Sequence, residues 1–512
     1  MAKSTSETER TVRKIIFTLS TNRILKSTQQ INLNENAKLE IMNRTNKSES
    51  RLNSLWIELK DAVSGSEADY TEIKIGKAIF LLAVPMILEL IMESTFAVVD
   101  IFFVGKLGPS AVATVGLTET YLFLLYSIGM GLAMAVTAIV ARRIGEKEKE
   151  KAGISAVQSI FLAVLISLPF AFAGIFYSKE LLAVMGADAW VIEHGYHYMQ
   201  WMLGGNAVIM LLFIINAIFR GAGDAAIAMR VLWIANGINM VLDPILIFGW
   251  GPFPQLGIEG AAIATNIGRG IGVLTQLWFL FNGVKHIRVF KSQLHFQWQT
   301  IKTIVKTSLG GVGQMIIAMT SWIFIMRILA EFGSEVVAGT TIALRIMMFT
   351  MMPAWGMSNA VATLVGQNLG AKKPDRAERS VWITGLWNMV FLIGVAVVYF
   401  LASESLVGIF TDDLKVISVG AMWLRIVSYS YFVYGWWMVA SQAFNGAGDT
   451  ITPTKINFVF FWLIEIPLSY FLAKTLGMEY SGVFWAIFIA ETSVGLFTLW
   501  LFKKGKWKSI QV

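Results

Sequence analysis

Long apolar stretches alternate with short polar connections from about residue 76 to the end of the chain. A hydrocarbon layer of about 30 Å is crossed by a helix of about 20 apolar residues, so each stretch of this length is a candidate membrane span. The pattern predicts twelve transmembrane helices, at residues 76–104, 110–140, 153–177, 188–219, 225–250, 258–283, 301–329, 335–366, 378–402, 416–443, 451–473 and 480–502. We therefore expect an all-α membrane protein.

The pattern repeats once along the chain. The segment FRGAGD at 219–224 returns as FNGAGD at 444–449, a shift of 225 positions (446 − 221). Residues 108–224 match the second half at this single shift without any gap. Such a long match favours duplication over chance matches among small residues. Because each half has an even number of helices, both halves start from the same side of the membrane, and we expect two parallel, pseudo-twofold-related six-helix bundles. Further pairs identical at this shift include Gly108 and Gly333, Val112 and Val337, Gly131 and Gly356, Val140 and Val365, and Gly145 and Gly370.

Each GAGD segment lies between the fourth and fifth helices of its half. Glycine can adopt the positive φ that ends a helix, and aspartate can cap the helix that follows. We interpret both segments as tight structural turns, and a moving hinge is the alternative. The turn residues are Gly221, Gly223, Asp224, Gly446, Gly448 and Asp449.

The composition excludes several classes of protein. The chain is 55% apolar and only 15% charged, whereas soluble proteins average about 25% charged residues. It has no cysteine, so it has neither a disulfide framework nor thiolate chemistry. No GxxxxGK[ST] loop is present, so ATP is not the expected energy source. We expect no cofactor, no bound metal and no enzymatic activity.

The net charge of +8 comes largely from the connections on one side of the predicted membrane. Every even-numbered connection carries Lys or Arg, as at Arg142, Arg143, Lys372 and Lys373, and the other connections carry few. Such residues gather on the cytoplasmic side of membranes. We therefore expect a multi-pass protein of the plasma (inner) membrane with both termini in the cytoplasm, and not a nucleic-acid-binding protein.

The alternation of apolar and polar segments sets the expected domain boundaries. We also expect the protein to be a monomer. The polar N-terminal part has the composition of a disordered segment. The expected parts are a cytoplasmic extension at 1–70, a first bundle at 71–283, a basic linker at 284–300, a second bundle at 301–503 and a basic tail at 504–512.

The first predicted helix carries three acids, Glu89, Glu93 and Asp100, at spacings of 4 and 7. These spacings add up to almost three helical turns, so the three carboxyl groups share one stripe of the helix. An ionisable group inside a membrane costs about 2.5–3.5 kcal/mol and marks a candidate functional site. The stripe should face protein or water, and at least one acid should hold a proton or a cation because three charges would repel.

The fifth helix reads NGINMVLDPILIF and places Asn239 and Asp243 one turn apart on the same face. Pro244 has no N–H to donate and clashes with the preceding turn, which predicts a bend or break that frees carbonyl oxygens. Thr265 adds a hydroxyl on the sixth helix. These oxygens predict a niche for a cation or a proton.

Several segments resemble the multidrug and toxic compound extrusion (MATE) family. They are PMILELIMESTFAVVDIFFVGKLGPSAVA, VGQNLGA, NMVLDPILIFGWG and both GAGD turns, and the resemblance covers the chain outside its N-terminal extension. It implies a twelve-helix antiporter whose coupling ion, H⁺ or Na⁺, binds Asp100, Asn239, Asp243 and Thr265. Glu93 departs from the family, which often has a neutral polar residue there, and we include it in the expected ion site.

The second half does not repeat the acids. Ile325 stands opposite Asp100 and, if the shift falls to 223, Ile466 stands opposite Asp243. Glu465 is the only acid deep in the eleventh predicted helix. We therefore expect ion coupling to reside in the first half.

The second half is expected to help hold the substrate, because its first two helices are rich in methionine. Methionine recurs at promiscuous surfaces, and aromatic faces attract organic cations. The expected activity is secondary active multidrug efflux of amphipathic, cationic compounds by rocker-switch alternating access. The candidate substrate-binding residues are Gln314, Met315, Met319, Met348, Met352 and Trp355.

Arginines inside the predicted helices keep an alternative open. If Arg269 and Arg345 both lined a central cavity, the substrate would be anionic, as in a flippase of the same clan that moves lipid-linked oligosaccharides or phospholipids. We predict that the two do not both line an open cavity. An intramembrane enzyme is disfavoured because no nucleophile–base pair is found at depth. The sequence leaves the choice between H⁺ and Na⁺ open.

Overall fold

The computed structural model describes residues 56–283 and 286–510. Its contacts divide the chain into two units, Met1–Asp61 and Ala62–Val512. Of the first unit only residues 56–61 are described, and they are helical. Residues 1–55 of the predicted extension therefore lie outside the described residues, and the second unit holds the membrane spans.

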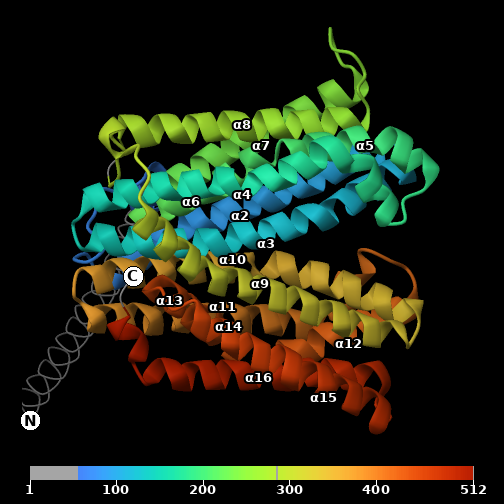
Figure 1. Cartoon of the computed structure of the whole chain (residues 1–512). Coiled ribbons are helices and arrows are strands. Elements are labelled where there is room, and N and C mark those ends of the chain that lie inside the picture. The colour runs from blue at the N-terminus through green and yellow to red at the C-terminus, as the bar shows by residue number, and fades with distance from the viewer. Residues whose placement is uncertain (1–55, 284–285, 511–512) are drawn as a thin grey trace, which may run out of the picture. The chain divides into compact units, whose positions relative to one another are not determined.

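The first half of the second unit forms one bundle of helices (Figure 1). α5 and α6 are separated only by Gly205 and together make one span, so this half supplies the six predicted spans. Its helices are α2 (Ile75–Gly105), α3 (Pro109–Gly145), α4 (Lys149–Val184), α5 (Ala189–Gly204), α6 (Asn206–Ala222), α7 (Ala225–Phe248) and α8 (Ile258–Asn282).

The second half forms the other bundle, after the short η1 (Lys291–Gln293). α12 and α13 meet at a bend of 64° and make the tenth predicted span. The eleventh span runs from α14 to η3 and includes two π-helical segments, η2 and η3. The elements are α9 (Trp298–Ala330), α10 (Ser334–Gly370), α11 (Pro374–Gly408), α12 (Leu414–Ser428), α13 (Tyr431–Ala447), α14 (Ile451–Asn457), η2 (Phe458–Glu465), α15 (Ile466–Tyr470), η3 (Phe471–Thr475), α16 (Glu479–Lys503) and η4 (Lys506–Ser509).

All twelve predicted segments are helical, so the predicted all-α membrane fold is confirmed. Among the described residues, ten helices are long and apolar enough to cross a membrane, or eleven if the bent pair counts as one span. α8 does not reach that threshold, and its polar residues Asn266, Arg269 and Gln276 account for its weaker hydropathy. Those side chains mark α8 as a helix that faces protein.

The two bundles contact each other through a symmetric set of helices. α3 packs on α9, α10 packs on α2, and α3 and α10 also touch. A Cβ at Gly131 of α3 would lie 2.3 Å from the Val312 nitrogen, and one at Gly356 of α10 would lie 2.9 Å from the Ile87 nitrogen. Both Gly131/Gly356 and Ile87/Val312 are separated by 225 positions. The duplicated sequence therefore builds the same close helix crossing twice.

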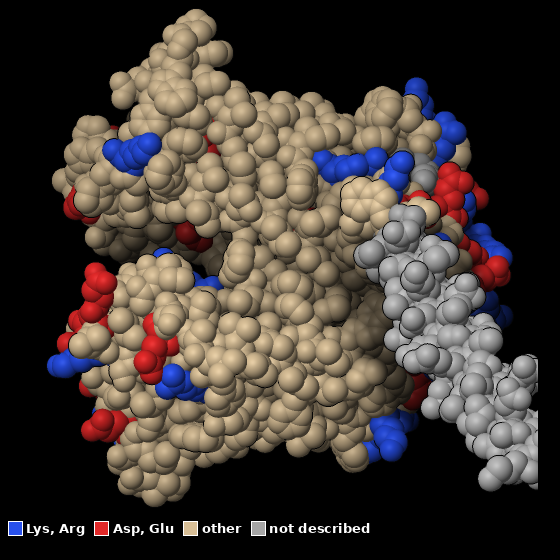
Figure 2. Space-filling view, turned by 180° about the vertical axis from the view of Figure 1, so that it is seen from behind, with Lys and Arg blue, Asp and Glu red and all other residues tan. Residues whose placement is uncertain are grey.

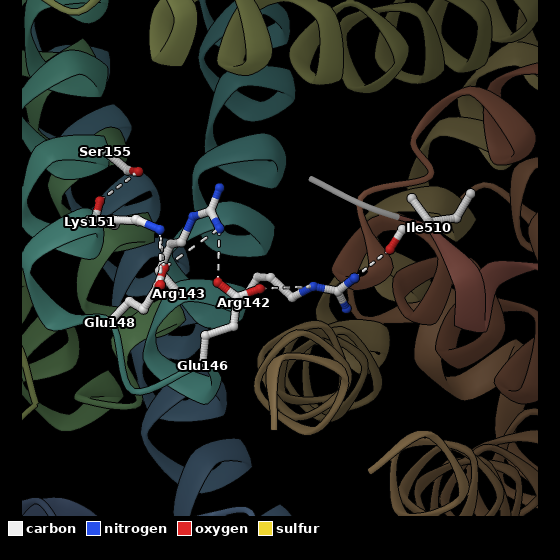
Figure 3. A network of polar contacts seen from close by, with 7 residues as sticks. All are labelled: Arg142, Arg143, Glu146, Glu148, Lys151, Ser155 and Ile510. Carbon is white, nitrogen blue, oxygen red and sulfur yellow. Dashed lines mark hydrogen bonds and ion pairs between the residues drawn. The ribbon is translucent and has the colours of Figure 1, made fainter. Parts of the chain in front are cut away.

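The C-terminal tail contacts both halves at one end of the second unit, which we call the basic end. Figure 3 shows Arg142 of α3 between Glu146 and the backbone of Ile510, whose carbonyl oxygen accepts a hydrogen bond from Arg142 Nη2. Lys508 pairs with Glu378 of α11 at 2.5 Å. The tail residues up to 510 are therefore part of the folded unit.

The bundles close tightly on each other at the basic end. A Cβ at Gly145 would lie 2.0 Å from the Gln367 carbonyl oxygen, and one at Gly370 would lie 2.2 Å from the Arg142 carbonyl oxygen. Gln367 and Arg142 are again 225 positions apart (367 − 142). Gln367 Nε2 also donates to the Gly221 carbonyl oxygen at 3.1 Å, so α10 reaches the GAGD turn of the other half.

Both GAGD segments form turns, with Gly223 at φ +96° and Gly448 at φ +90°. Asp449 accepts hydrogen bonds from the backbone and hydroxyl of Thr452 at the start of α14. Asp224 does not cap α7, contrary to the expectation for that residue. Its carboxylate instead lies 2.8 Å from His286 Nδ1 and holds the linker between the halves.

The first bundle begins earlier than the predicted boundary at residue 71. Ala62 and Tyr70 are 1% and 3% exposed. Tyr70 donates to the Gly223 carbonyl oxygen at 3.2 Å. An aromatic residue in an otherwise polar stretch anchors this segment to the turn, which the polar composition of the stretch concealed.

We expect Gly131→Ala to destabilise the protein, because the added Cβ meets backbone atoms that cannot move aside. Overpacking of this kind costs about 1–3 kcal/mol. Gly116→Ala in the same helix is the matched control, since a Cβ there has nothing within 4 Å and alanine is favoured in helices. Thermal unfolding in detergent should show a lower midpoint for Gly131→Ala only. Equal midpoints would contradict the close crossing of α3 and α9.

Candidate functional site

The three acids of α2 all face the interior of the first bundle, as the stripe predicted. Glu93 Oε1 lies 3.0 Å from Arg269 Nη2 of α8, and its Oε2 accepts from Asn236 Nδ2 of α7 at 3.0 Å. Arg269 is only 6% exposed and also stacks over the Phe96 ring at 5.3 Å. Glu93 and Arg269 therefore neutralise each other inside the bundle.

Asp243 lies at the centre of this region and is completely buried. Among the described residues, neither of its carboxylate oxygens has a hydrogen-bond partner, and the same holds for Asn239 Oδ1. Asn239 Nδ2 donates to Thr265 Oγ1 at 3.1 Å. Asp100 is close enough to interact electrostatically with both Asp243 and Arg269. Four of the five predicted ion-site residues therefore meet here, and Glu93 is attached to them through Arg269.

α7 runs without interruption from Ala225 to Phe248, so the predicted break at Pro244 does not occur. The proline still removes one donor from the helix. The carbonyl oxygen of Met240, four residues earlier, consequently lacks its usual N–H partner. The niche keeps a free backbone oxygen next to Asp243 although the helix is intact.

The chemistry of this niche is that of a site for H⁺ or a hard cation. Buried polar atoms are nearly always hydrogen-bonded, and an uncompensated carboxylate in a membrane is costly. Carboxylate, amide, hydroxyl and carbonyl oxygens are the ligands that hard cations take. No group of three or more His, Cys, Asp and Glu side chains suited to a metal ion occurs within residues 56–283 and 286–510.

Glu89 belongs to a separate polar network. It lies 3.3 Å from Arg220 Nη1 and accepts from Asn216 Nδ2, also at 3.3 Å. Gln276 Nε2 in turn donates to Asn216 Oδ1 at 2.5 Å. Arg220 compensates the charge of Glu89 through Oε1, while Glu89 Oε2 has no hydrogen-bond partner among the described residues. Asp243 differs because neither of its oxygens has a partner there.

A cavity of about 210 Å³ lies between the two bundles and includes Arg220 in its wall. Equivalent positions of the two halves line it in pairs, with Arg220 opposite Asn445 and Met134 opposite Asn359 (445 − 220 and 359 − 134 are both 225). Figure 2 shows a hollow between the bundles that has acidic and basic side chains in it, whereas Arg220 is the one charged residue among the described residues that line the cavity. The remaining lining residues are Leu90, Met130, Ala133, Thr137, Phe213, Ala362 and Gln442.

None of the predicted substrate-binding residues lines this cavity. Gln314 is 5% exposed and donates to Asn445 Oδ1 and to the Thr450 carbonyl oxygen, both at 3.0 Å. Met352 accepts from Ser94 Oγ at 3.2 Å. Met319, Met348 and Trp355 are 37%, 48% and 37% exposed, and Met315 is partly buried.

The cavity residues could have been found by applying the repeat shift to the polar positions. Asn359 and Asn445 are polar residues of apolar helices, and each is the mate of a first-half residue on the same face. The prediction about arginines is confirmed, because Arg269 is buried against Glu93 and only Arg345 is exposed.

Comparison with known proteins gives a family match in each half. The MatE family profile matches residues 85–245 and 312–471, together more than half of the chain. The chain is 26% identical over 438 residues to the "Probable multidrug resistance protein NorM" of Thermotoga maritima, which covers 85% of this chain and 94% of that protein. It is 24% identical over 402 residues to a "FAD transporter" of Shewanella oneidensis, which covers 77% of this chain and 87% of that protein.

A solved structure of similar fold is the "Outward-facing conformation of a multidrug resistance MATE family transporter of the MOP superfamily". It matches with a TM-score of 0.79 and 23% identity over 86% of this chain and 98% of that chain. The match confirms the two-bundle fold.

We expect Glu93→Gln to lower the free energy of unfolding by about 1–2 kcal/mol, because the buried Arg269 would lose its nearest counter-charge, a carboxylate that is itself 38% exposed. Glu404→Gln is the matched control, since Arg425 and Glu404 have the same 3.0 Å geometry but are 41% and 65% exposed. An exposed pair contributes about 0–1 kcal/mol. Unfolding by SDS titration measures both variants, and equal losses would contradict the assignment of Glu93 as the counter-charge of Arg269.

Proposed function

Because the chain belongs to the MatE family of transporters, we propose that it is a secondary active antiporter that exports amphipathic, cationic organic compounds in exchange for H⁺ or Na⁺. The observation that carries this proposal is the completely buried Asp243, whose carboxylate oxygens lack partners beside the free Asn239 Oδ1. A structural carboxylate at such a place would be paired, as Glu89 and Glu93 are. An exchangeable proton or cation accounts for the missing partner.

In this proposal Asp243 and Asp100 bind the ion, and Asn239 and Thr265 orient it. The amide and hydroxyl are already joined by a hydrogen bond of 3.1 Å, which leaves Asn239 Oδ1 to face the ion. Glu93 has the lesser role of fixing Arg269, whose positive charge lies close to Asp100. Among the described residues, Asp243 has no basic side chain acting on it, so we assign the exchangeable proton or cation to Asp243.

Transport requires the central cavity to open alternately to the two sides. The contacts at the basic end close it on that side, and we assign this end to the cytoplasm because the Lys- and Arg-rich connections lie there. Rocking of the bundles would separate Gly145 from Gln367 and Gly370 from Arg142, which now touch. All the residues involved come from one chain, so a monomer in the plasma membrane is sufficient.

The cavity wall supports an amphipathic substrate. Leu90, Met130, Met134 and Phe213 supply apolar and polarizable surface, and Asn359, among others, supplies amide groups. The relative from Thermotoga maritima is named for multidrug resistance, which agrees with a cavity that has few directional contacts.

One observation favours a second candidate, export of an anionic amphiphile or lipid flipping. Arg345 of α10 is exposed, and no hydrogen bond or ion pair of its side chain is found within the described part of the chain. The Shewanella oneidensis relative is named for FAD, an anionic molecule. Uptake of cationic and anionic fluorescent dyes into everted vesicles separates the two candidates.

We expect Asp243→Asn and Asp100→Asn each to abolish gradient-driven efflux from proteoliposomes while leaving the protein monodisperse. The amide keeps the size of the side chain but cannot exchange a proton and holds a cation less well. Asp412→Asn is the control, because Asp412 is an exposed residue of a connection. A pH gradient and a Na⁺ gradient are applied separately to identify the ion. Normal efflux by monodisperse Asp243→Asn would place the ion site elsewhere.

A further inference from the structure

The second half contains two buried acids that the ion site of the first half does not use. Glu465 is 6% exposed and ends the π-helical segment η2. Glu491 of α16 is partly buried and near enough to interact electrostatically with Glu465. Only Glu465 stands out in the sequence, because Glu491 follows an apolar run and its mate at the shift of 225 is the neutral Asn266.

The protons around Glu491 can be counted. Ser430 Oγ lies 2.7 Å from the Val427 carbonyl oxygen and 2.7 Å from Glu491 Oε2. A carbonyl oxygen can only accept, and a serine hydroxyl has one proton to donate. One hydroxyl proton serves both acceptors only if it is shared between them, and a proton on the Glu491 carboxyl group would supply the second hydrogen bond.

Glu465 has no such partner. Neither a hydrogen bond nor an ion pair of its carboxyl group is found in the described part of the chain, although it is almost completely buried. One turn further on, Ser469 is completely buried and its hydroxyl is also unpartnered. Buried polar atoms nearly always have a hydrogen-bond partner, so each exception needs an explanation. A bound ligand, or a proton carried by the carboxyl group itself, provides one here.

The surroundings contain no basic side chain that acts on either acid. The titratable groups that interact with them are Tyr434, next to both, and Tyr431, next to Glu491, with Tyr399 behind Tyr431. Glu89 and Glu93 in the first half are each paired with an arginine. The second pair of acids must therefore be neutralised by protons.

The last two spans of each half contact each other closely, and this contact suggests which residue of the second half corresponds to Arg269. Gly260 of α8 meets the Leu246 carbonyl group, and Gly482 of α16 meets the Leu472 carbonyl group in the same way. Aligning these two glycines gives a shift of 222 (482 − 260), which places Glu491 opposite Arg269. At this shift a carboxyl group of the second half aligns with the arginine of the first.

We propose that Glu465 and Glu491 form a second proton-binding site, located in the C-terminal half beside the α12–α13 bend. The site goes beyond the proposed function, because it follows from the contacts of the second half whether or not Asp243 couples transport. Its irregular setting supports an exchangeable group, since the Ser430 hydroxyl sits at the 64° bend and π-helical segments such as η2 are frequent at functional sites. The partly buried Glu491 is the route by which the proton reaches Glu465.

Infrared difference spectra of the full-length protein in lipid, recorded while the pH is changed, test the site directly. The carbonyl stretch of a protonated carboxyl group is the readout. We expect Glu491→Gln and Glu465→Gln each to remove one pH-dependent component, and Asp243→Asn to leave both. Spectra of the two glutamine variants that match the unmodified protein would overturn the proposal.

Ser430→Ala gives a second test if a glutamine variant does not fold. Loss of the hydroxyl removes a hydrogen bond to Glu491 Oε2, so the Glu491 component should move to higher frequency. An unchanged band in folded Ser430→Ala contradicts the assignment. The infrared readout does not depend on efflux. If Asp243→Asn still transports normally, the proposed function fails but the carboxyl bands of the second half can still be found. If those bands are absent while Asp243→Asn abolishes efflux, only the second site fails.

Discussion

Compensation of buried charge is the constraint on which the rest of this structure depends. A carboxylate deep in a membrane protein is costly unless a cation, a proton or an arginine neutralises it. The first half meets this constraint with arginines at two of its acids, Arg220 at Glu89 and Arg269 at Glu93. Asp243 is then left without a compensating partner, which is the condition for reversible binding of an ion. The arginine pairs hold Glu89 and Glu93 of α2 in fixed contacts, so in the proposed ion site only Asp100 and Asp243 remain to bind a proton or cation.

The duplication provides the framework that holds these groups. Each half places a glycine of its second span against the first span of the other half, so the backbones approach closely at Gly131 and Gly356. The same shift relates the contacts of Gly145 and Gly370 at the basic end. Because interfaces of this kind are packed without space for a side chain, they hold one arrangement firmly. The proposed rocking of the bundles requires each of them to move as a rigid body, which such packing favours.

The sequence predicted the twelve helical segments, the duplication and the grouping of Asp243, Asn239 and Thr265, because each depends on periodicity or on spacing within one or two helices. Asp243 and Asn239 share a face by spacing alone. It did not predict that α7 continues as one helix through Pro244. It also missed Glu491, whose partner Ser430 lies 61 positions away. Contacts between distant segments, such as that of Asp224 with His286, carry no local signal, so the expected cap of α7 was wrong.

Arg220 links the parts of the molecule that transport must connect. Its side chain neutralises Glu89 and lines the central cavity. Its backbone oxygen accepts from Thr363 Oγ1 of α10 at 2.9 Å, within the contact that closes the basic end. The equivalent residue of the second half is Asn445, which is neutral and bonds to Gln314 and Gln442. A group that enters the cavity therefore meets the charge of Arg220 on the first bundle and the neutral Asn445 on the second. If that group changed the pairing of Arg220 with Glu89, it would act on the helix turn that contacts Thr363 of the other bundle. Divergence of the two halves has thus placed the counter-charge of Glu89, the one charged residue among the described residues of the cavity wall and a closing contact on Arg220.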